Sequence, residues 1–372
     1  MPVMLATEAA PPPPVGPRLP RTVMPFIDHG GGHSTHELAS LHAASRRLPA
    51  LLGCAGDDAG ASGAGARYWL PMRTLLREEA ERLGIGDEGG LWGGVVPHAF
   101  VGTKLVSHPC WPGGSGVPAG WRDVPGIEAS TLPGWSVFTR ADALAACEAL
   151  LEGGPVRIKS PYARGGNDQT VVDDARAARD WLQSAAAIGV EHGLVVERDL
   201  AEAATYGVGS ARVGEHAIAY HGTQRTVTDP HGKRVYGGSR LTVFRGDLAS
   251  LCATLPPGEA REAVCTAMQY DRAVRGAYRV LASRCNYDVI VGHDRDGVRH
   301  CGVLEQSWRF GGASMAELLA MERFARDPDL RWVVAETVEA YDRDALPDDA
   351  VLVWPGDAES PCKYARVVDD GY

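Results

Sequence analysis

The chain has 372 residues, of which 45% are hydrophobic and 23% are charged, and its formal net charge is −10. This length exceeds one typical domain, so it predicts a soluble globular protein with two or three domains packed together. The acidic balance argues against nucleic acid as a partner, because binding to a polyphosphate backbone depends on clustered Lys and Arg. A small-molecule ligand is favoured instead.

The first 20 residues include "AAPPPPVGPRLPR" and predict an extended, disordered tail. A secretory signal is not expected, because a basic segment followed by an apolar run is missing, and no stretch has transmembrane length. The eight cysteines are scattered without a C-x-x-C pair, which predicts reduced thiols. The cytoplasm is the expected location, with no membrane partner.

The N-terminal elements follow from local patterns. An apolar run at 22–28 predicts a strand, and 34–48 predicts a helix capped by Ser34 with Glu37 at the capping-box position. A loop rich in Gly, Ala and Asp follows at 53–66, and apolar residues at helical spacing predict a second helix over 73–85.

Strands and helices continue to alternate beyond residue 137, which predicts an α/β or α+β class with mixed sheets. The expected helices are 141–154, the end of 171–189, a pair around 257–283, and 314–328. The expected strands are 155–161, the start of 171–189, 192–200, 204–213, 216–227, 240–246, and two strands within 287–309 joined by the turn at 294–297.

Several attractive motifs fail on their context. The segment "GIGDEG" at 84–89 matches G-x-G-x-x-G, but it follows a helix and carries acidic residues where a pyrophosphate would bind. The lipase-like "DHGGGH" has no G-x-S-x-G partner, and the chain has no P-loop motif. His29, His33 and His36 are crowded but lack H-E-x-x-H spacing, so a metal site there is disfavoured and their role stays open.

Three other segments remain as candidates for ligand chemistry. Lys159 leaves a strand and precedes a turn with Gly165 and Gly166, which can fold over phosphates or be a simple hairpin. The strand at 192–200 ends in "ERDL", whose main chain can meet a flat base, although any strand leaving a core looks similar.

The third segment is "GVLEQSWRFGGAS" at 302–314. Alternation along a strand places Glu305, Ser307 and Arg309 on one face, and the turn brings Asp288 near Glu305. Two facing carboxylates repel unless a cation lies between them, and hard oxygen ligands suit Mg²⁺. The alternative is a pair of solvated acids held by Arg295 or Arg299.

The order of these segments resembles the ATP-grasp superfamily over roughly residues 100–325: a strand with Lys and a Gly turn, an apolar strand ending in Glu, then Asp and E-x-[N]-x-R-x-G-G. More narrowly, "GGVVPHAFVGTKLVSHP", "TYGVGSARVG", "VYGGSRLTV" and "GVLEQSWRFGGAS" resemble the bacterial ATP-grasp-like family DUF3182. The implied fold holds ATP between two α+β lobes after a small α/β domain. The domains are then a tail at 1–20, the α/β domain at 21–130, lobes at 131–196 and 197–345, and a C-terminal extension at 346–372.

The resemblance also implies roles for individual residues. ATP contacts would come from Lys104, Lys159, Gly165, Gly166, Glu197, Arg198, Asp199, Leu200 and Glu202, with Asp199 or Glu202 at the ribose. Mg²⁺ ligands would be Asp288 and Glu305, with Ser307 where most members have Asn. Arg309 would face the transferred phosphoryl group beside Lys159, and Arg225 and Arg240 are candidate anchors for a carboxylate substrate.

The activity implied is an ATP-dependent ligase that makes an acyl phosphate from a carboxylate and joins it to an amine or a peptide. A phosphotransferase and a degenerate nucleotide-binding module are the alternatives. The resemblance leaves the two substrates and the oligomeric state open, with a homodimer as one option.

Overall fold

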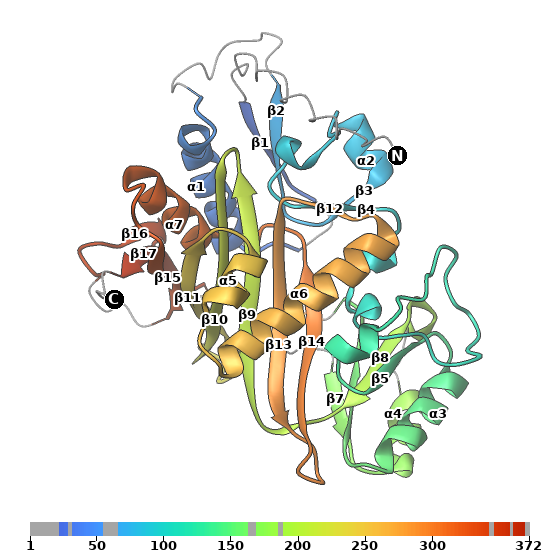
Figure 1. Ribbon diagram of the computed structural model, residues 1–372. Helices are drawn as coiled ribbons and strands as arrows, with labels where there is room; N and C mark the ends of the chain where they lie inside the picture. Colours follow the sequence, from blue (N-terminus) through green and yellow to red (C-terminus); the bar gives the residue numbers. More distant parts are fainter. Residues whose placement is uncertain are drawn as a thin grey trace, which may run out of the picture.

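The computed structural model describes residues 22–28, 32–54, 66–162, 169–184, 189–341, 346–357 and 360–368. Figure 1 shows three parts: a small N-terminal unit, a lobe around a four-stranded sheet, and a larger lobe around an eight-stranded sheet. We call the four-stranded part lobe A and the eight-stranded part lobe B.

The N-terminal unit contains β1 (Thr22–Phe26), α1 (Thr35–Leu51), β2 (Arg67–Pro71), β3 (Leu75–Leu76), α2 (Arg77–Arg82) and β4 (Gly94–Val96). β1 and β2 pair in parallel, and β4 lies between β3 and β12 (Leu281–Ala282). The predicted cap of α1 is confirmed, since Glu37 accepts a hydrogen bond from the Ser34 N–H at 2.8 Å while Ser34 accepts one from the Glu37 N–H. The helix predicted over 73–85 is wrong at its start, because the segment Leu75–Leu76 pairs with β4 instead.

One short 3-10 turn, η1 (Glu88–Gly90), lies within this unit before β4. Three more lead toward lobe A: η2 (Ala99–Gly102), η3 (Lys104–Ser107) and η4 (Ile127–Ser130). η3 contacts β14 (Arg299–Ser307) of lobe B as well as β5 (Gly134–Val137) and β8 (Leu194–Arg198) of lobe A, so it lies at the junction of the two lobes.

Lobe A is an antiparallel sheet in the order β5-β8-β6-β7. Two capped helices pack with it around an apolar core that includes Val156, Ile158 and Val196. Thr139 caps the first helix and Asp174 the second. Its elements are β5 (Gly134–Val137), α3 (Arg140–Leu151), β6 (Val156–Lys159), β7 (Gln169–Val172), α4 (Ala175–Gln183), η6 (Val190–His192) and β8 (Leu194–Arg198).

Lobe B is built on the sheet β14-β13-β9-β10-β11-β15-β17-β16, in which every neighbouring pair is antiparallel. The residues expected as a C-terminal extension supply β16 and β17 of this sheet. The elements are β9 (Ala201–Val213), β10 (His216–Thr228), β11 (Arg234–Arg245), α5 (Leu248–Thr254), α6 (Glu259–Tyr278), β13 (Arg284–His293), β14 (Arg299–Ser307), α7 (Ser314–Arg326), β15 (Trp332–Ala340), β16 (Val351–Trp354) and β17 (Cys362–Val368).

The large sheet separates two apolar layers, as strand alternation requires. Along β10, Ile218 and Tyr220 join a core cluster with α1 and α7, whereas Ala219 joins a cluster with α5 and α6. The face toward α7 and the face toward α6 are therefore distinct, and a side chain's strand position decides which face it occupies.

Two expectations for lobe B are corrected. The predicted helix pair around 257–283 is a single helix, α6, preceded by the shorter α5. Cys252 and Cys265 form a disulfide, although reduced thiols were expected. Packing of α5 against α6 brings the two cysteines together across the intervening turn, with a Cα–Cα distance of 5.8 Å.

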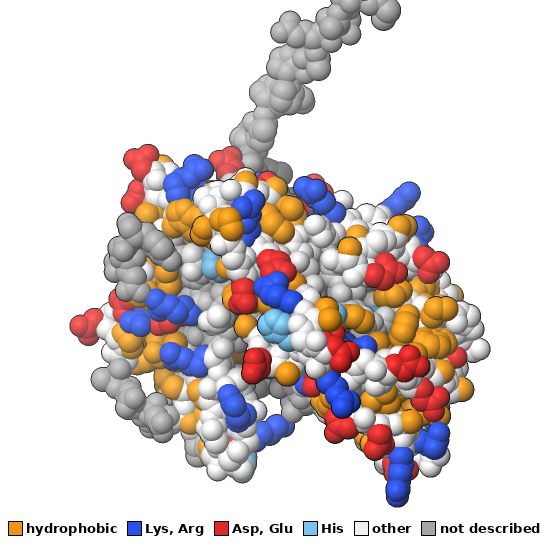
Figure 2. Space-filling model, turned by 60° about the horizontal axis from the view of Figure 1, so that its bottom comes forward, with side chains coloured by type: hydrophobic (Ala, Val, Ile, Leu, Met, Phe, Trp, Pro, Cys, Tyr) orange, Lys and Arg blue, Asp and Glu red, His pale blue; other side chains and the backbone are white. Residues whose placement is uncertain are grey.

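The arrangement agrees with the ATP-grasp organisation that the resemblance implied: a small α/β unit followed by two α+β lobes. None of the helices in the described ranges has the length and apolar character needed to cross a bilayer. On the face shown in Figure 2, Lys and Arg side chains are interspersed with Asp and Glu side chains over the described residues, in keeping with a mixed-charge surface.

Candidate functional site

The two predicted metal carboxylates lie directly opposite each other on neighbouring strands. The register pairs Asp288 with Glu305 and Asn286 with Ser307, and an irregularity follows Asp288. Paired residues of an antiparallel ladder point to the same face, so all four side chains lie on the α7 face of the sheet. The predicted proximity of Asp288 and Glu305 is confirmed.

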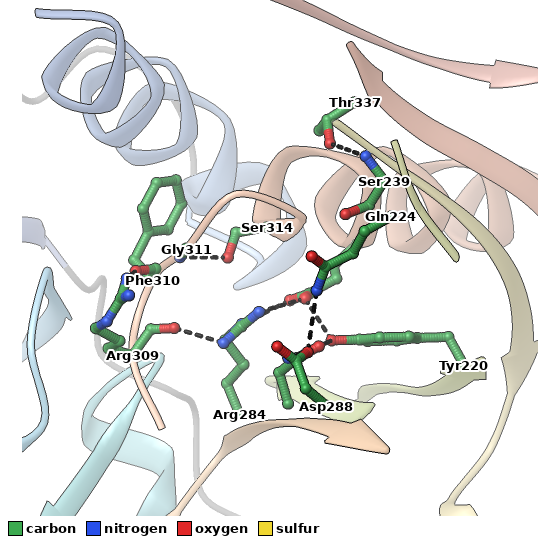
Figure 3. Close-up of polar contacts among 12 residues, drawn as sticks. Tyr220, Gln224, Ser239, Arg284, Asp288, Arg309, Phe310, Gly311, Ser314 and Thr337 are labelled. Carbon is green, nitrogen blue, oxygen red and sulfur yellow. Dashed lines mark hydrogen bonds and ion pairs between the residues drawn. The ribbon is translucent and has the colours of Figure 1, made fainter. Parts of the chain in front are cut away.

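Amide side chains surround Asp288. Gln224 donates from Nε2 to Asp288 Oδ1 at 3.0 Å, and Asn286 donates from Nδ2 to the same oxygen at 3.3 Å. Figure 3 shows Gln224 reaching this carboxylate from the neighbouring part of the sheet. Burial and the adjacent charge of Glu305 together raise the pKa of Asp288 to about 7.

Lys104 meets Glu305 from the lobe junction, with its Nζ atom 2.5 Å from the Glu305 Oε2 atom. The segment that carries Lys104 is fixed from lobe B by Gln306, whose Nε2 donates to the carbonyls of Val101 at 3.1 Å and Thr103 at 2.5 Å. From lobe A, Ser136 Oγ donates to the carbonyl of Leu105 at 2.5 Å. Both lobes thus determine where this ammonium lies.

Lys159 and Glu197 form a buried ion pair in lobe A, with side chains 6% and 1% exposed. Strand β6 supplies Lys159 and its neighbour β8 supplies Glu197. His108 is also buried, with its Nε2 atom 3.6 Å from Glu197 Oε2. Burial lowers the pKa of His108 to about 3, assisted by the charge of Lys159, so the imidazole is neutral at pH 7.

Burial raises the pKa of Glu197, and the charges of Lys159, Arg157 and Lys104 oppose that effect. Lys104 likewise lowers the pKa of Asp288, against burial and the charge of Glu305. The ammonium of Lys104 therefore acts on acidic groups of both lobes. Two lysines and three carboxylates from different parts of the chain share one region at the junction.

The strand end expected to meet adenine is largely engaged within lobe A. The main-chain N–H groups of Arg198 and Asp199 donate to the carbonyls of Pro133 and Pro155, and the Asp199 carboxylate accepts two hydrogen bonds from Arg157.

The remaining residues of that strand end lie beyond these bonds. The side chain of Leu200 is buried, whereas Glu202 is exposed and has a φ of 47°. Neither the Asp199 carboxylate, held by an arginine, nor the exposed Glu202 contacts the buried ion pair in the described structure.

Arg309 follows β14, and its position depends on a buried network shown in Figure 3. Its carbonyl accepts a hydrogen bond from Arg284 Nη1 at 2.5 Å, and its own guanidinium donates to the Phe310 carbonyl at 2.8 Å. Arg284 in turn donates to Glu317 of α7 at 2.9 and 2.6 Å. The arginine therefore lies on the α7 side, where the Asp288 and Glu305 side chains also point.

One contact involves Arg309, and another involves Gly312, three residues further along the chain. Although burial acts to raise the pKa of Glu37, hydrogen bonds from Ser34 and the charges of His36 and Arg309 lower it, which places Arg309 near the start of α1. A Cβ atom at Gly312 would lie 2.8 Å from the ring of Tyr236, so glycine lets the chain pass this ring.

Arg225 and Arg240 are not brought to this site. Gln224 pairs with Ser239 across β10 and β11, so the neighbouring positions 225 and 240 point to the opposite, α6 side of the sheet. Arg240 forms an ion pair with Glu336 at 3.3 Å. These two arginines therefore lie on the other face of the sheet from Asp288 and Glu305, and their role as anchors for a carboxylate substrate stays a prediction.

The remaining predicted residues fall into two groups. Gly165, Gly166 and His29 lie outside the described residues. His36 lies 3.5 Å from Glu339, and both ring nitrogens of His33 are buried without a hydrogen-bond partner among the described residues. Within the described ranges, no group of three His, Cys, Asp or Glu side chains is arranged to hold a metal ion by itself.

A family model described as "Protein of unknown function (DUF3182)" matches residues 27–367, which include every candidate described above. The chain belongs to the DUF3182 family. A comparison with curated proteins finds no match.

Solved structures similar to this DUF3182 chain include three ATP-grasp proteins. Biotin carboxylase from Campylobacter jejuni, in a βγ-ATP complex, is 11% identical over 88% of this chain and 75% of its own, with a TM-score of 0.45. D-alanyl-alanine synthetase A from Vibrio cholerae is 9% identical over 82% and 93%, with a TM-score of 0.45. The biotin carboxylase domain of Hydrogenobacter thermophilus 2-oxoglutarate carboxylase is 12% identical over 64%, with a TM-score of 0.37, and this chain spans 58% of its length. These are remote likenesses.

A hollow of about 490 Å³ lies elsewhere on the DUF3182 structure, at the start of α6, between Pro257, Glu262 and Arg299. None of the candidate residues lines it, and it is open to solvent, so the convergence of charged groups identifies the site better than this hollow does.

Four residues of the candidate site were not predicted from the sequence: Asn286, Gln224, Gln306 and His108. A signal existed for two of them. Asn286 lies two positions from Asp288, and Gln306 lies between Glu305 and Ser307, so alternation alone predicts that Asn286 shares their face and that Gln306 points away. His108 and Gln224 come from other segments, and only the fold brings them close.

Proposed function

We propose that this DUF3182 protein is an ATP-dependent ligase. It would activate a carboxylate as an acyl phosphate, join it to an amine or a similar nucleophile, and release ADP and phosphate. The observation that carries the proposal is the position of Lys104, which contacts Glu305 of lobe B and influences the pKa of Glu197 in lobe A. Positive charge at a junction between lobes, in a protein of net charge −10, suits a polyphosphate ligand.

The lobe A end of this site fits the base of a nucleotide. Glu197 Oε2 and His108 Nε2 are buried, and neither has a hydrogen-bond partner among the described residues. A buried carboxylate oxygen without a donor is costly, and an exocyclic amino group of a base can supply that donor. Leu200, buried next to the engaged strand end, would contribute apolar contact.

The lobe B end fits Mg²⁺. Burial, and after it the adjacent charge of Glu305, raise the pKa of Asp288 to about 7, and a cation between the two carboxylates would remove their repulsion. Mg²⁺ commonly binds through one or two protein carboxylates plus phosphate oxygens and water, so a cage of three acidic residues is not required. Ser307, on the same face, is a further oxygen within this set.

When bound, MgATP supplies the phosphoryl group and a metal ion that neutralises its charge. The residues of this chain would position the nucleotide and stabilise the charge on its phosphates. Lys104 and Lys159 would hold the phosphates, and Arg309 would supply fixed positive charge to the phosphoryl group, which lowers a barrier to transfer.

Product analysis tests the proposal and separates it from two other activities. The purified protein is given ATP, Mg²⁺ and pools of carboxylates and amines, and ADP and free phosphate are measured. A ligase needs both pools and releases both products. A phosphotransferase forms ADP without free phosphate, and a nucleotide-binding module forms neither, so either result would reject the ligase.

Two variants connect the assay to the site. Arg309→Lys should retain nucleotide binding but lose most ADP formation, because Lys lacks the planar fork that meets a phosphoryl group. Thr223→Ala is the control, since Thr223 is exposed on the α6 side of the sheet. Equal activity of Arg309→Lys and Thr223→Ala would remove Arg309 from the mechanism.

A further inference from the structure

The α7 face carries an amide side chain next to the carboxylate pair. Asn286 lies beside Asp288 on β13 and directly opposite Ser307 on β14. Its amide contacts two groups, because Nδ2 donates to Asp288 Oδ1 at 3.3 Å and Oδ1 accepts from Tyr220 Oη at 3.0 Å. Asn286 thus contacts one candidate carboxylate, Asp288, and lies opposite Ser307.

The Asn286 amide has a second favourable orientation, which follows from the single proton of the Tyr220 hydroxyl. The hydroxyl carries one proton, yet two acceptors lie within reach: Asn286 Oδ1 at 3.0 Å and Glu317 Oε1 at 2.7 Å. Arg284 donates two hydrogen bonds to Glu317 and holds it as a charged carboxylate. The closer, charged acceptor takes the proton, since charge-assisted hydrogen bonds are the stronger ones.

The tyrosine oxygen then needs a donor from Asn286. A half-turn of the amide supplies it, because Nδ2 then donates to Tyr220 Oη and Oδ1 faces Asp288. Without a cation, this turn sets an amide oxygen against a carboxylate oxygen, which is unfavourable. With a cation between them, both oxygens coordinate it, and every group in the network has a partner.

We propose that Asn286 is a ligand of the divalent cation, acting with Asp288 and Glu305. The pair Glu317–Arg284, through Tyr220, turns its amide oxygen toward the cation. Gln224 stays a hydrogen-bond donor to Asp288 (Figure 3). This assignment rests on the proposed MgATP function, and it adds an amide oxygen from β13 to the acidic residues of the site. Amide oxygens suit Mg²⁺ and Mn²⁺.

Binding of Mn²⁺, followed by electron paramagnetic resonance in the presence of ADP, tests the assignment without relying on turnover. Asn286→Ser should weaken Mn²⁺ binding by about tenfold or more, as loss of a group from a metal site typically does. The reciprocal exchange Asn286→Ser/Ser307→Asn should restore affinity, because it moves the amide to the facing strand. Tyr220→Phe should weaken Mn²⁺ binding in the same direction, and Thr223→Ala should leave it unchanged.

Thermal melting of each variant shows whether the fold is retained. If Asn286→Ser is unstable, Tyr220→Phe still tests the inference, because it removes only one oxygen. Wild-type protein that binds neither ADP nor Mn²⁺ would overturn the proposed function itself. Wild-type protein that binds both, with Asn286→Ser and Tyr220→Phe showing wild-type Mn²⁺ affinity, would overturn this inference alone.

Discussion

Replacing Glu317 with Gln removes one charge from the buried pair that fixes the main chain of Arg309. The side chains of Arg284 and Glu317 are 2% and 0% exposed. Gln keeps the shape of Glu but leaves the Arg284 guanidinium buried without a carboxylate. Breaking a buried ion pair in this way costs about 3–5 kcal/mol, a large share of a typical total stability of about 5–15 kcal/mol. We expect E317Q to lose about that much free energy of unfolding.

Urea denaturation, followed by tryptophan fluorescence and circular dichroism, measures the loss. The midpoint should fall by about 1 M or more for a slope of about 3 kcal/mol/M. The double variant Arg284→Met/Glu317→Leu should recover most of the loss, because replacing both charges also removes their desolvation cost. Arg299→Met is the surface control, since Arg299 and its partner Glu262 are 39% and 39% exposed, and it should change stability by about 1 kcal/mol or less. Wild-type stability in E317Q, or a double variant no better than E317Q, would refute the reasoning.

Three further predictions concern packing, pH and the lobe junction. Gly302→Ala should lower the free energy of unfolding by about 1–3 kcal/mol, because its Cβ would lie 2.6 Å from the main-chain nitrogen of Leu132. Gly276→Ala, in open space on α6, should raise the free energy of unfolding by about 0.5–1 kcal/mol. The hydrogen bond from Arg73 lowers the pKa of Glu79 to about 2 from its usual 4.5, so Glu79 stabilises the fold above pH 4.5 and this contribution disappears as the pH falls toward 2. Glu79→Gln should therefore flatten the dependence of the free energy of unfolding on pH in that window. Urea denaturation at several pH values measures this dependence, and the same dependence in the variant and the wild-type protein would contradict the prediction. Lys104→Met should weaken binding of an ATP analogue by about tenfold or more, as loss of a charge-assisted hydrogen bond of about 1.5–3 kcal/mol implies, and calorimetric titration would show it.

Local signals in the sequence predicted the elements that depend on neighbouring residues. The capping box of Ser34 and Glu37 specified the start of α1, and the turn at 294–297 specified the hairpin that pairs Asp288 with Glu305. The start of α2 was missed for a non-local reason, since the preceding residues gain more by pairing with β4 than by extending a helix.

The site was predictable only in part, because strand register decides which face a side chain occupies. Arg240 was a reasonable anchor by composition, yet its pairing with Glu336 places it on the α6 side. His108 could not be linked to Glu197 from the sequence, because their proximity arises when η3 packs between the lobes. The disulfide of Cys252 and Cys265 likewise depends on helix packing and not on a spacing motif.

We expect a nucleotide and a divalent cation to bind together where Lys104 joins the two lobes. Calorimetric titration of a non-hydrolysable ATP analogue, with and without Mg²⁺, tests this most directly. Mg²⁺ should strengthen binding to the wild-type protein, and Asp288→Asn/Glu305→Gln should abolish this dependence while the fold is retained. Absence of binding, or Mg²⁺-dependent binding that persists in the double variant, would contradict it.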